Sequence, residues 1–118
     1  LMALRLAIHL SLLGKGGFTR LARLNLAKAR FAREQLSALA AYSLRHDGPA
    51  FSEICLRVPG GNATAVVRAA AAKGVVPGVA LGRFSPELDD TLLVSVNESH
   101  TRQDIETLAR TLAKIGQE

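Results

Sequence analysis

Hydrophobic residues in the first part of the chain recur with a helical spacing. Residues 1–13 are mostly apolar, and three glycines within residues 14–17 interrupt the pattern. From about residue 18 to residue 45, apolar side chains fall on one side of a helical wheel and arginines on the other. Residues 46–49, His-Asp-Gly-Pro, stop this helix because proline cannot continue it. The spacing therefore predicts a short, mostly apolar but amphipathic helix followed by a long amphipathic helix.

One polar residue interrupts the apolar side of the long helix. Lys28 falls within this arc, close to Asn25. A lysine in such a position extends its ammonium group to the edge of the interface, or it meets a carboxylate from a neighbouring surface. Both interpretations remain open at this stage.

The second part of the chain shows the alternating pattern of strands. Residues 51–58 and 91–97 alternate apolar and polar side chains, and residues 75–84 form a shorter, interrupted strand. Pro77 confines the interrupted strand to a sheet edge or to a strand start, because proline cannot donate a ladder hydrogen bond. In the strand at 91–97, Leu92, Val94 and Val96 share one face.

Two further helices are marked by their capping residues. Asn62 is suited to cap a helix that closes near Gly74. Thr101, followed three residues later by Asp104, forms a variant of the capping box at the start of the last helix.

This order of elements predicts the fold class. Strands with one apolar face need a helical layer on that face only. We therefore expect an α+β two-layer sandwich, with a small, largely antiparallel sheet and helices on one face.

We assign residues 1–46 to connecting helices and residues 47–118 to an α+β small domain, in one compact unit. Because the first residue is Leu1 rather than methionine, we expect a fragment of a larger protein.

Length and composition agree with a small globular unit. The chain has 118 residues, of which 48% are hydrophobic and 21% charged, so it can form a core. A single cysteine, Cys55, allows no internal disulfide, which fits a reducing, cytoplasmic compartment. Residues 1–13 are too short to span a bilayer and lack a signal-peptide cleavage site. We therefore expect no membrane association, and we expect this helix to dock on another surface.

Positive charge is concentrated in the first part of the chain, and the net charge is +5. A solvated helix face accounts for this stripe, and so does a surface for an acidic partner. A basic α+β module that binds nucleic acid is therefore an alternative function. Base stacking has little support, because only 4% of the residues are aromatic.

The sequence contains no recognisable catalytic or metal-binding cluster. The three histidines fall in separate elements, whereas a zinc site needs three or four converging ligands. Residues 12–18, LLGKGGF, lack the spacer and the Ser or Thr of a phosphate-binding loop. Cys55 is expected to pack as a small hydrophobic residue. We therefore predict no catalytic, cofactor-binding or metal-binding residue.

Three segments, taken in order, resemble a known family. They read LLGKGGFTRLARLNLAKARF, FSEICLRVP and GVALGRFSPELDDTLLVSVNESHTRQDIETLARTL. The most specific pieces are LGRF with PEL, and NE followed by TR. Together they resemble the C-terminal region of the glycine cleavage system P-protein, glycine dehydrogenase (decarboxylating). The closest resemblance is to the non-catalytic first subunit of the two-subunit bacterial form.

The resemblance implies a fold and a role. Such proteins have the type I pyridoxal-phosphate transferase fold, in which a small C-terminal domain closes over a large cofactor-binding domain. The whole enzyme decarboxylates glycine and transfers the aminomethyl group to the lipoyl H-protein. The Schiff-base lysine belongs to the large domain of the catalytic subunit, and no lysine here has a comparable setting. The fragment is therefore expected to bind neither pyridoxal phosphate nor glycine alone, and to be inactive alone.

The resemblance also suggests a place of contact. We expect the loop with Gly82, Arg83, Phe84 and Pro86, together with Glu98, to meet the catalytic subunit or domain, or the H-protein. Arg83 would act as a forked donor and Phe84 as an apolar anchor. Alternatively, the loop contacts only its own domain and no partner. An alternative parent protein is another type I pyridoxal-phosphate enzyme of the aminotransferase kind.

Overall fold

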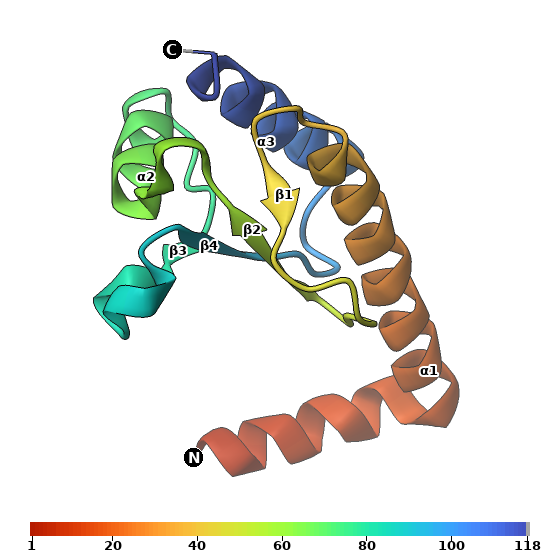
Figure 1. Cartoon of the computed structure of the whole chain (residues 1–118). Coiled ribbons are helices and arrows are strands. Elements are labelled where there is room, and N and C mark those ends of the chain that lie inside the picture. Colours follow the sequence, from red (N-terminus) through yellow and green to blue (C-terminus); the bar gives the residue numbers. More distant parts are fainter. Residues whose placement is uncertain (118) are drawn as a thin grey trace.

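The chain begins with a long helix that is bent near its first third (Figure 1). A computed structural model describes residues 1–117 and shows helix α1 at Met2–Ser37. The bend lies at Gly14, whose φ of 61° and ψ of 178° are accessible in practice only to glycine. The predicted interruption is therefore a kink at one residue. We call residues 1–13, which precede the kink, the arm.

Helix α1 ends at Ser37 and not near residue 45 as the helical wheel predicted. The chain turns and forms the two-residue strand β1, Ser43–Leu44. This strand pairs antiparallel with β2, Glu53–Arg57, and the backbone amide of Arg45 donates to the carbonyl of Cys55 at 2.9 Å. Pairing with a distant strand thus replaces the helical bonds that local periodicity favours.

Four strands form one antiparallel sheet in the order β1-β2-β4-β3. The central pair joins β2 to β4, Thr91–Ser95, and the far edge is β3, Val79–Ala80. The register places Ile54 opposite Val94 and Leu56 opposite Leu92, and all four side chains are buried. The sheet therefore has one apolar face, as the alternation predicted.

Helices cover this apolar face only. Helix α2, Ala63–Ala72, and helix α3, Arg102–Ile115, pack there with the second part of α1 (Figure 1). The core between the two layers includes the fully buried side chains of Leu36, Leu56, Leu92 and Leu112. The predicted α+β two-layer architecture, with a small antiparallel sheet, is confirmed.

Both predicted helix caps are present. The Oδ1 atom of Asn62 accepts a hydrogen bond of 2.9 Å from the amide of Ala65, at the start of α2. At the start of α3, the amide of Asp104 donates to Thr101 Oγ1 at 3.1 Å, and the amide of Thr101 donates to Asp104 Oδ2 at 2.7 Å. These bonds satisfy backbone donors that have no partner inside the helix.

Candidate interface loop and the open face of the sheet

Residues 81–88, which we call the 81–88 loop, connect β3 to the start of β4. The loop consists of two short 3-10 turns, Leu81–Arg83 and Pro86–Leu88. Within it, the amide of Phe84 donates to Leu81 O at 2.9 Å and the amide of Leu88 donates to Ser85 O at 3.0 Å. The loop therefore satisfies much of its own backbone hydrogen bonding and has a defined shape.

The loop is also fixed to the domain by the two residues that follow it. A Cβ atom at Gly82 would overlap the carboxylate of Asp89, so only glycine fits this approach. The backbone carbonyls of Asp89 and Asp90 accept hydrogen bonds of 2.8 Å from the amides of Ala63 and Val58, respectively. The end of the loop is thereby tied both to the start of α2 and to the end of β2.

Arg83 and Phe84 of this loop project into solvent. The Phe84 side chain is 70% exposed, and the guanidinium carbon of Arg83 lies 5.1 Å from the centre of its ring. This distance allows a cation–π interaction, which holds the two side chains together on the surface. An exposed aromatic ring on a well-bonded loop is a suitable anchor for a protein partner.

The structure brings four of the five predicted contact residues together. Gly82, Arg83, Phe84 and Pro86 belong to the 81–88 loop, before β4, whereas Glu98 follows the other end of that strand.

The backbone carbonyls of Glu98 and His100 accept hydrogen bonds of 2.5 Å and 2.6 Å from the ammonium group of Lys28. Lys28 therefore binds main-chain carbonyls, an outcome that neither sequence interpretation named.

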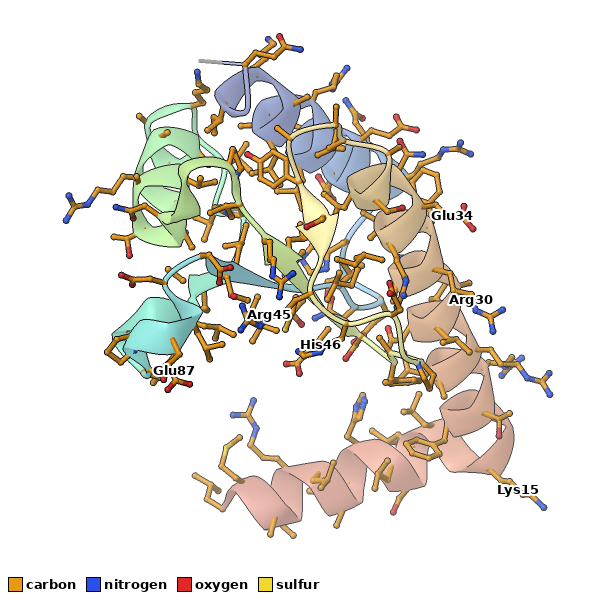
Figure 2. All side chains as sticks on the ribbon, in the orientation of Figure 1. Lys15, Arg30, Glu34, Arg45, His46 and Glu87 are labelled. Atoms are coloured by element: carbon orange, nitrogen blue, oxygen red, sulfur yellow. The ribbon has the colours of Figure 1, made fainter. Side chains whose placement is uncertain are left out.

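A charged cluster beside the loop was missed by sequence reasoning. Arg45 Nη1 donates to Asp90 Oδ1 at 2.7 Å and to Thr91 Oγ1 at 2.8 Å, and Thr91 Oγ1 donates to Asp90 Oδ1 at 2.7 Å. Arg57 Nε lies 3.6 Å from Asp90 Oδ2. The cluster joins the residue after β1 to the start of β4, and Figure 2 shows Arg45 directed towards this part of the sheet.

This cluster makes the stability of the folded protein depend on pH. The hydrogen bond from Thr91, with the positive charges of Arg45 and Arg57, lowers the pKa of Asp90 below its ordinary value of 3.8. The pKa of Asp90 is lower in the folded state than in the unfolded chain. The stability that the charged carboxylate contributes is therefore fully present above the unfolded-state pKa, and it is lost as the pH falls through the folded-state pKa. We expect Asp90→Asn to lower the melting temperature by a few degrees at neutral pH. The difference from the unaltered protein should shrink as the solution is acidified below about pH 4.

Melting curves recorded from neutral to strongly acidic pH test this expectation. Asp104→Asn is the comparison variant, because the hydrogen bonds from Thr101 lower the pKa of Asp104 in a separate part of the chain. The variant that combines Asp90→Asn with Asp104→Asn should have a melting temperature that depends less on pH than that of either single variant. A constant gap between Asp90→Asn and the unaltered protein at every pH would contradict the assignment.

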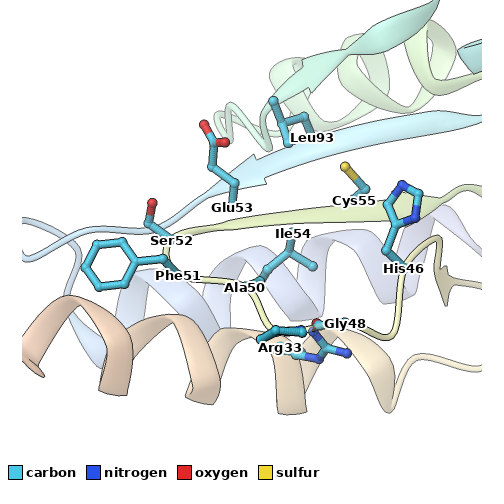
Figure 3. A pocket seen from close by; sticks show the side chains of 11 residues that line it. Arg33, His46, Gly48, Ala50, Phe51, Ser52, Glu53, Ile54, Cys55 and Leu93 are labelled. Carbon is cyan, nitrogen blue, oxygen red and sulfur yellow. Dashed lines mark hydrogen bonds between the residues drawn. The ribbon is translucent and has the colours of Figure 1, made fainter. Parts of the chain in front are cut away.

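On the face of the sheet opposite the helices, which we call the open face, Cys55 and Leu93 border a pocket that extends around the connection between β1 and β2 to Arg33 of α1 (Figure 3). Its volume is about 380 Å³, and the side chains around it include Arg33, His46, Glu53 and Cys55. Arg33 is already engaged, since it donates to the carbonyls of Asp47 at 3.1 Å and Gly48 at 3.0 Å. Within residues 1–117 no three His, Cys, Asp or Glu side chains converge as a metal site.

Comparisons with known proteins identify close relatives. No known family profile matches the chain. It is 46% identical over 115 residues to the probable glycine dehydrogenase (decarboxylating) subunit 1 of Desulfovibrio desulfuricans, covering 98% of this chain and 26% of that protein. The protein of the same name from Xanthobacter autotrophicus is 44% identical over 117 residues, with the same two coverages. The chain therefore spans about a quarter of the length of these relatives, and the resemblance seen in the sequence is confirmed.

Solved structures show the same fold. A glycine decarboxylase (P-protein) of the glycine cleavage system, in inhibitor-bound form, matches with a TM-score of 0.81 at 24% identity. That match covers 92% of this chain and 24% of the solved one. The aminotransferase TlmJ from Streptoalloteichus hindustanus matches with a TM-score of 0.61 at 17% identity, over 86% of this chain and 34% of its own. The same arrangement of helices and sheet thus occurs in both proteins.

Proposed function

We propose that this chain is a non-catalytic domain of a glycine dehydrogenase (decarboxylating) subunit 1, from the C-terminal part of that subunit. The observation that carries the proposal is the 46% identity over 98% of the chain. In this proposal the whole enzyme acts in the cytoplasm. It decarboxylates glycine and passes the aminomethyl group to the lipoyl H-protein. The domain contributes shape and contacts to an active centre whose reactive groups belong to another domain or subunit.

The residues of this domain do not fit a pyridoxal phosphate site of their own. When bound to an enzyme, this cofactor supplies an electron sink, and it needs a lysine to carry it. Lys15, Lys73 and Lys114 are exposed on the surface, and the ammonium group of Lys28 is bound by two main-chain carbonyls. The cofactor of the full enzyme would therefore be held elsewhere, and no step of its chemistry is assigned to this chain.

The division of the chain into two parts belongs to the same proposal. Residues 1–46 would connect the domain to the rest of the subunit, and residues 47–118 would form the small domain. Strand β1 lies within the first part and pairs with the sheet of the second. This pairing would fix the direction in which α1 leaves the small domain.

The 81–88 loop is the surface through which the domain would meet the catalytic subunit. Its backbone is bonded internally, and Gly82 packs against Asp89, so little conformational entropy would be lost on binding. The exposed ring of Phe84, with Arg83 stacked on it, would insert into the partner. Pro86 is exposed beside them, whereas Glu98 lies outside this surface.

Phe84→Ala in the full-length subunit is expected to weaken binding to the catalytic subunit by about tenfold or more, because the variant removes the central apolar anchor. The measurement is the dissociation constant, by titration calorimetry. Val76→Ala is the matched control, since Val76 is 84% exposed in a different segment and should bind as the unaltered protein does. If Phe84→Ala and Val76→Ala bind equally well, the loop is not the contact surface.

A further inference from the structure

The arm exposes an unusual amount of apolar surface. Seven of its large hydrophobic residues are exposed, from 38% at Leu10 to 94% at Leu1. Figure 1 shows that the arm turns sharply at the kink and runs crosswise to the rest of α1. The exposed hydrophobic residues of the arm are Leu1, Met2, Leu4, Leu6, Ile8, Leu10 and Leu12. Such a continuous apolar surface on a protein marks a place of contact.

The distribution of these residues around the helix indicates how they are covered. At about 100° per residue, the only long polar side chains, Arg5 and His9, fall within one narrow sector of the arm. Apolar and small residues occupy roughly 280° of the circumference, far more than the stripe of about 100° that a surface helix buries. A helix that is apolar on almost every side is typical of a protein interior.

This distribution disfavours partners that cover one side of a helix. An interfacial membrane helix has one apolar face opposite a strongly charged face, which the arm lacks. No helix within residues 1–117 combines the length and hydropathy needed to cross a bilayer. A two-stranded coiled coil with a second copy buries a narrow seam, and most of the arm would remain exposed.

We propose that the arm is a core helix of the larger part of the subunit, enclosed by it on all sides except the Arg5–His9 sector. The length of the relatives identifies what encloses the arm. They are about four times as long as this chain, which covers 26% of the Desulfovibrio desulfuricans protein, so the rest of the subunit is available to surround it. Gly14 sets the angle at which the arm enters that part. The inference rests on the proposed place of this chain within subunit 1, but not on the reaction that the subunit supports.

The test compares the 118-residue chain with the same residues inside a full-length subunit. The full-length form is made by exchanging this chain for the matching 115 residues of the Desulfovibrio desulfuricans relative. Ala7→Cys places a thiol on the apolar side, and His9→Cys places one in the polar sector. Ala71→Cys, on the exposed surface of α2, is the control outside the arm. Alkylation rates at each site are read by peptide mass spectrometry, and circular dichroism confirms folding.

We expect the cysteine at position 7 to react at least about tenfold more slowly in the full-length subunit than in the 118-residue chain. The cysteines at positions 9 and 71 should change by less than about threefold. In a second measurement, without any substitution, backbone amides of the arm should exchange with deuterium more slowly in the full-length subunit.

Three results would overturn the proposal. The first is an equal rate at position 7 in both proteins, together with fast amide exchange of the arm. The second is protection in the 118-residue chain that rises with its concentration, which would assign the arm to a second copy. The third is protection that appears only with vesicles of anionic phospholipid, which would assign it to a membrane surface.

Discussion

Replacing Leu92 with alanine is expected to lower the free energy of unfolding by about 2–5 kcal/mol. Leu92 lies in the central strand β4, opposite Leu56 on one side and Ala80 on the other, and its side chain is completely buried. Truncation removes apolar contacts and leaves a cavity that its neighbours fill only in part. Because domains of this kind are stable by about 5–15 kcal/mol, the variant should lose a large share of its stability.

Urea denaturation followed by circular dichroism measures this loss. Leu24→Ala is the matched control, because it makes the same chemical change in helix α1 at a side chain that is 45% exposed. The control should lose less than about 1 kcal/mol. Equal midpoints for the two variants would mean that Leu92 does not belong to the core described above.

Gly78→Ala is expected to separate β3 from the sheet. Gly78 has a φ of 146°, which residues with a side chain rarely adopt, and an added Cβ would overlap the backbone carbonyl of Leu93. The backbone strain alone costs about 1–3 kcal/mol, and the overlap must be relieved by moving the strand. Since β3 leads directly into the 81–88 loop, the variant should also misplace Phe84.

The separation is measured by hydrogen exchange at Val79, which pairs with Leu93, and by the affinity for the catalytic subunit. Gly48→Ala is the control, because no heavy atom lies within 4 Å of the Cβ that it adds and its φ is not in the left-handed region. We expect fast exchange and weakened binding for Gly78→Ala only. Slow exchange at Val79 in this variant would disprove the role given to Gly78.

Elements governed by local sequence were predictable. The caps at Asn62 and Thr101 were correct, because a cap needs only residues within one helical turn of it. The alternation in β4 was also correct, because burial of one sheet face imposes a period of two. Pro77 correctly placed its segment next to a strand at the edge of the sheet.

Features that depend on distant partners were not predictable. Strand β1 has two residues and no periodicity of its own, so only its pairing with β2 defines it. The Arg45–Asp90 ion pair joins residues 45 positions apart in the sequence. A sequence pattern does not reveal which of several arginines meets a given carboxylate.

The candidate contact surface was partly predictable. The loop expected around Gly82 and Pro86 is present, since such residues favour turns. The exposure of Phe84 was expected only through the family resemblance, because an aromatic residue in a loop can equally pack inwards. Glu98 was grouped with the loop through the family resemblance, although the strand expected at residues 91–97 already lay between them, and in the fold β4 separates the two.

The central claim is that this domain supplies shape and contacts, and that the reactive groups belong to another part of the enzyme. The most direct measurement supplies the purified 118-residue chain with pyridoxal phosphate and glycine, with and without the catalytic subunit. The absorbance retained after gel filtration and the released carbon dioxide are recorded. We predict that the chain alone retains no cofactor and releases no carbon dioxide. Stoichiometric retention of pyridoxal phosphate by the chain alone, or release of carbon dioxide from glycine without the catalytic subunit, would contradict the claim.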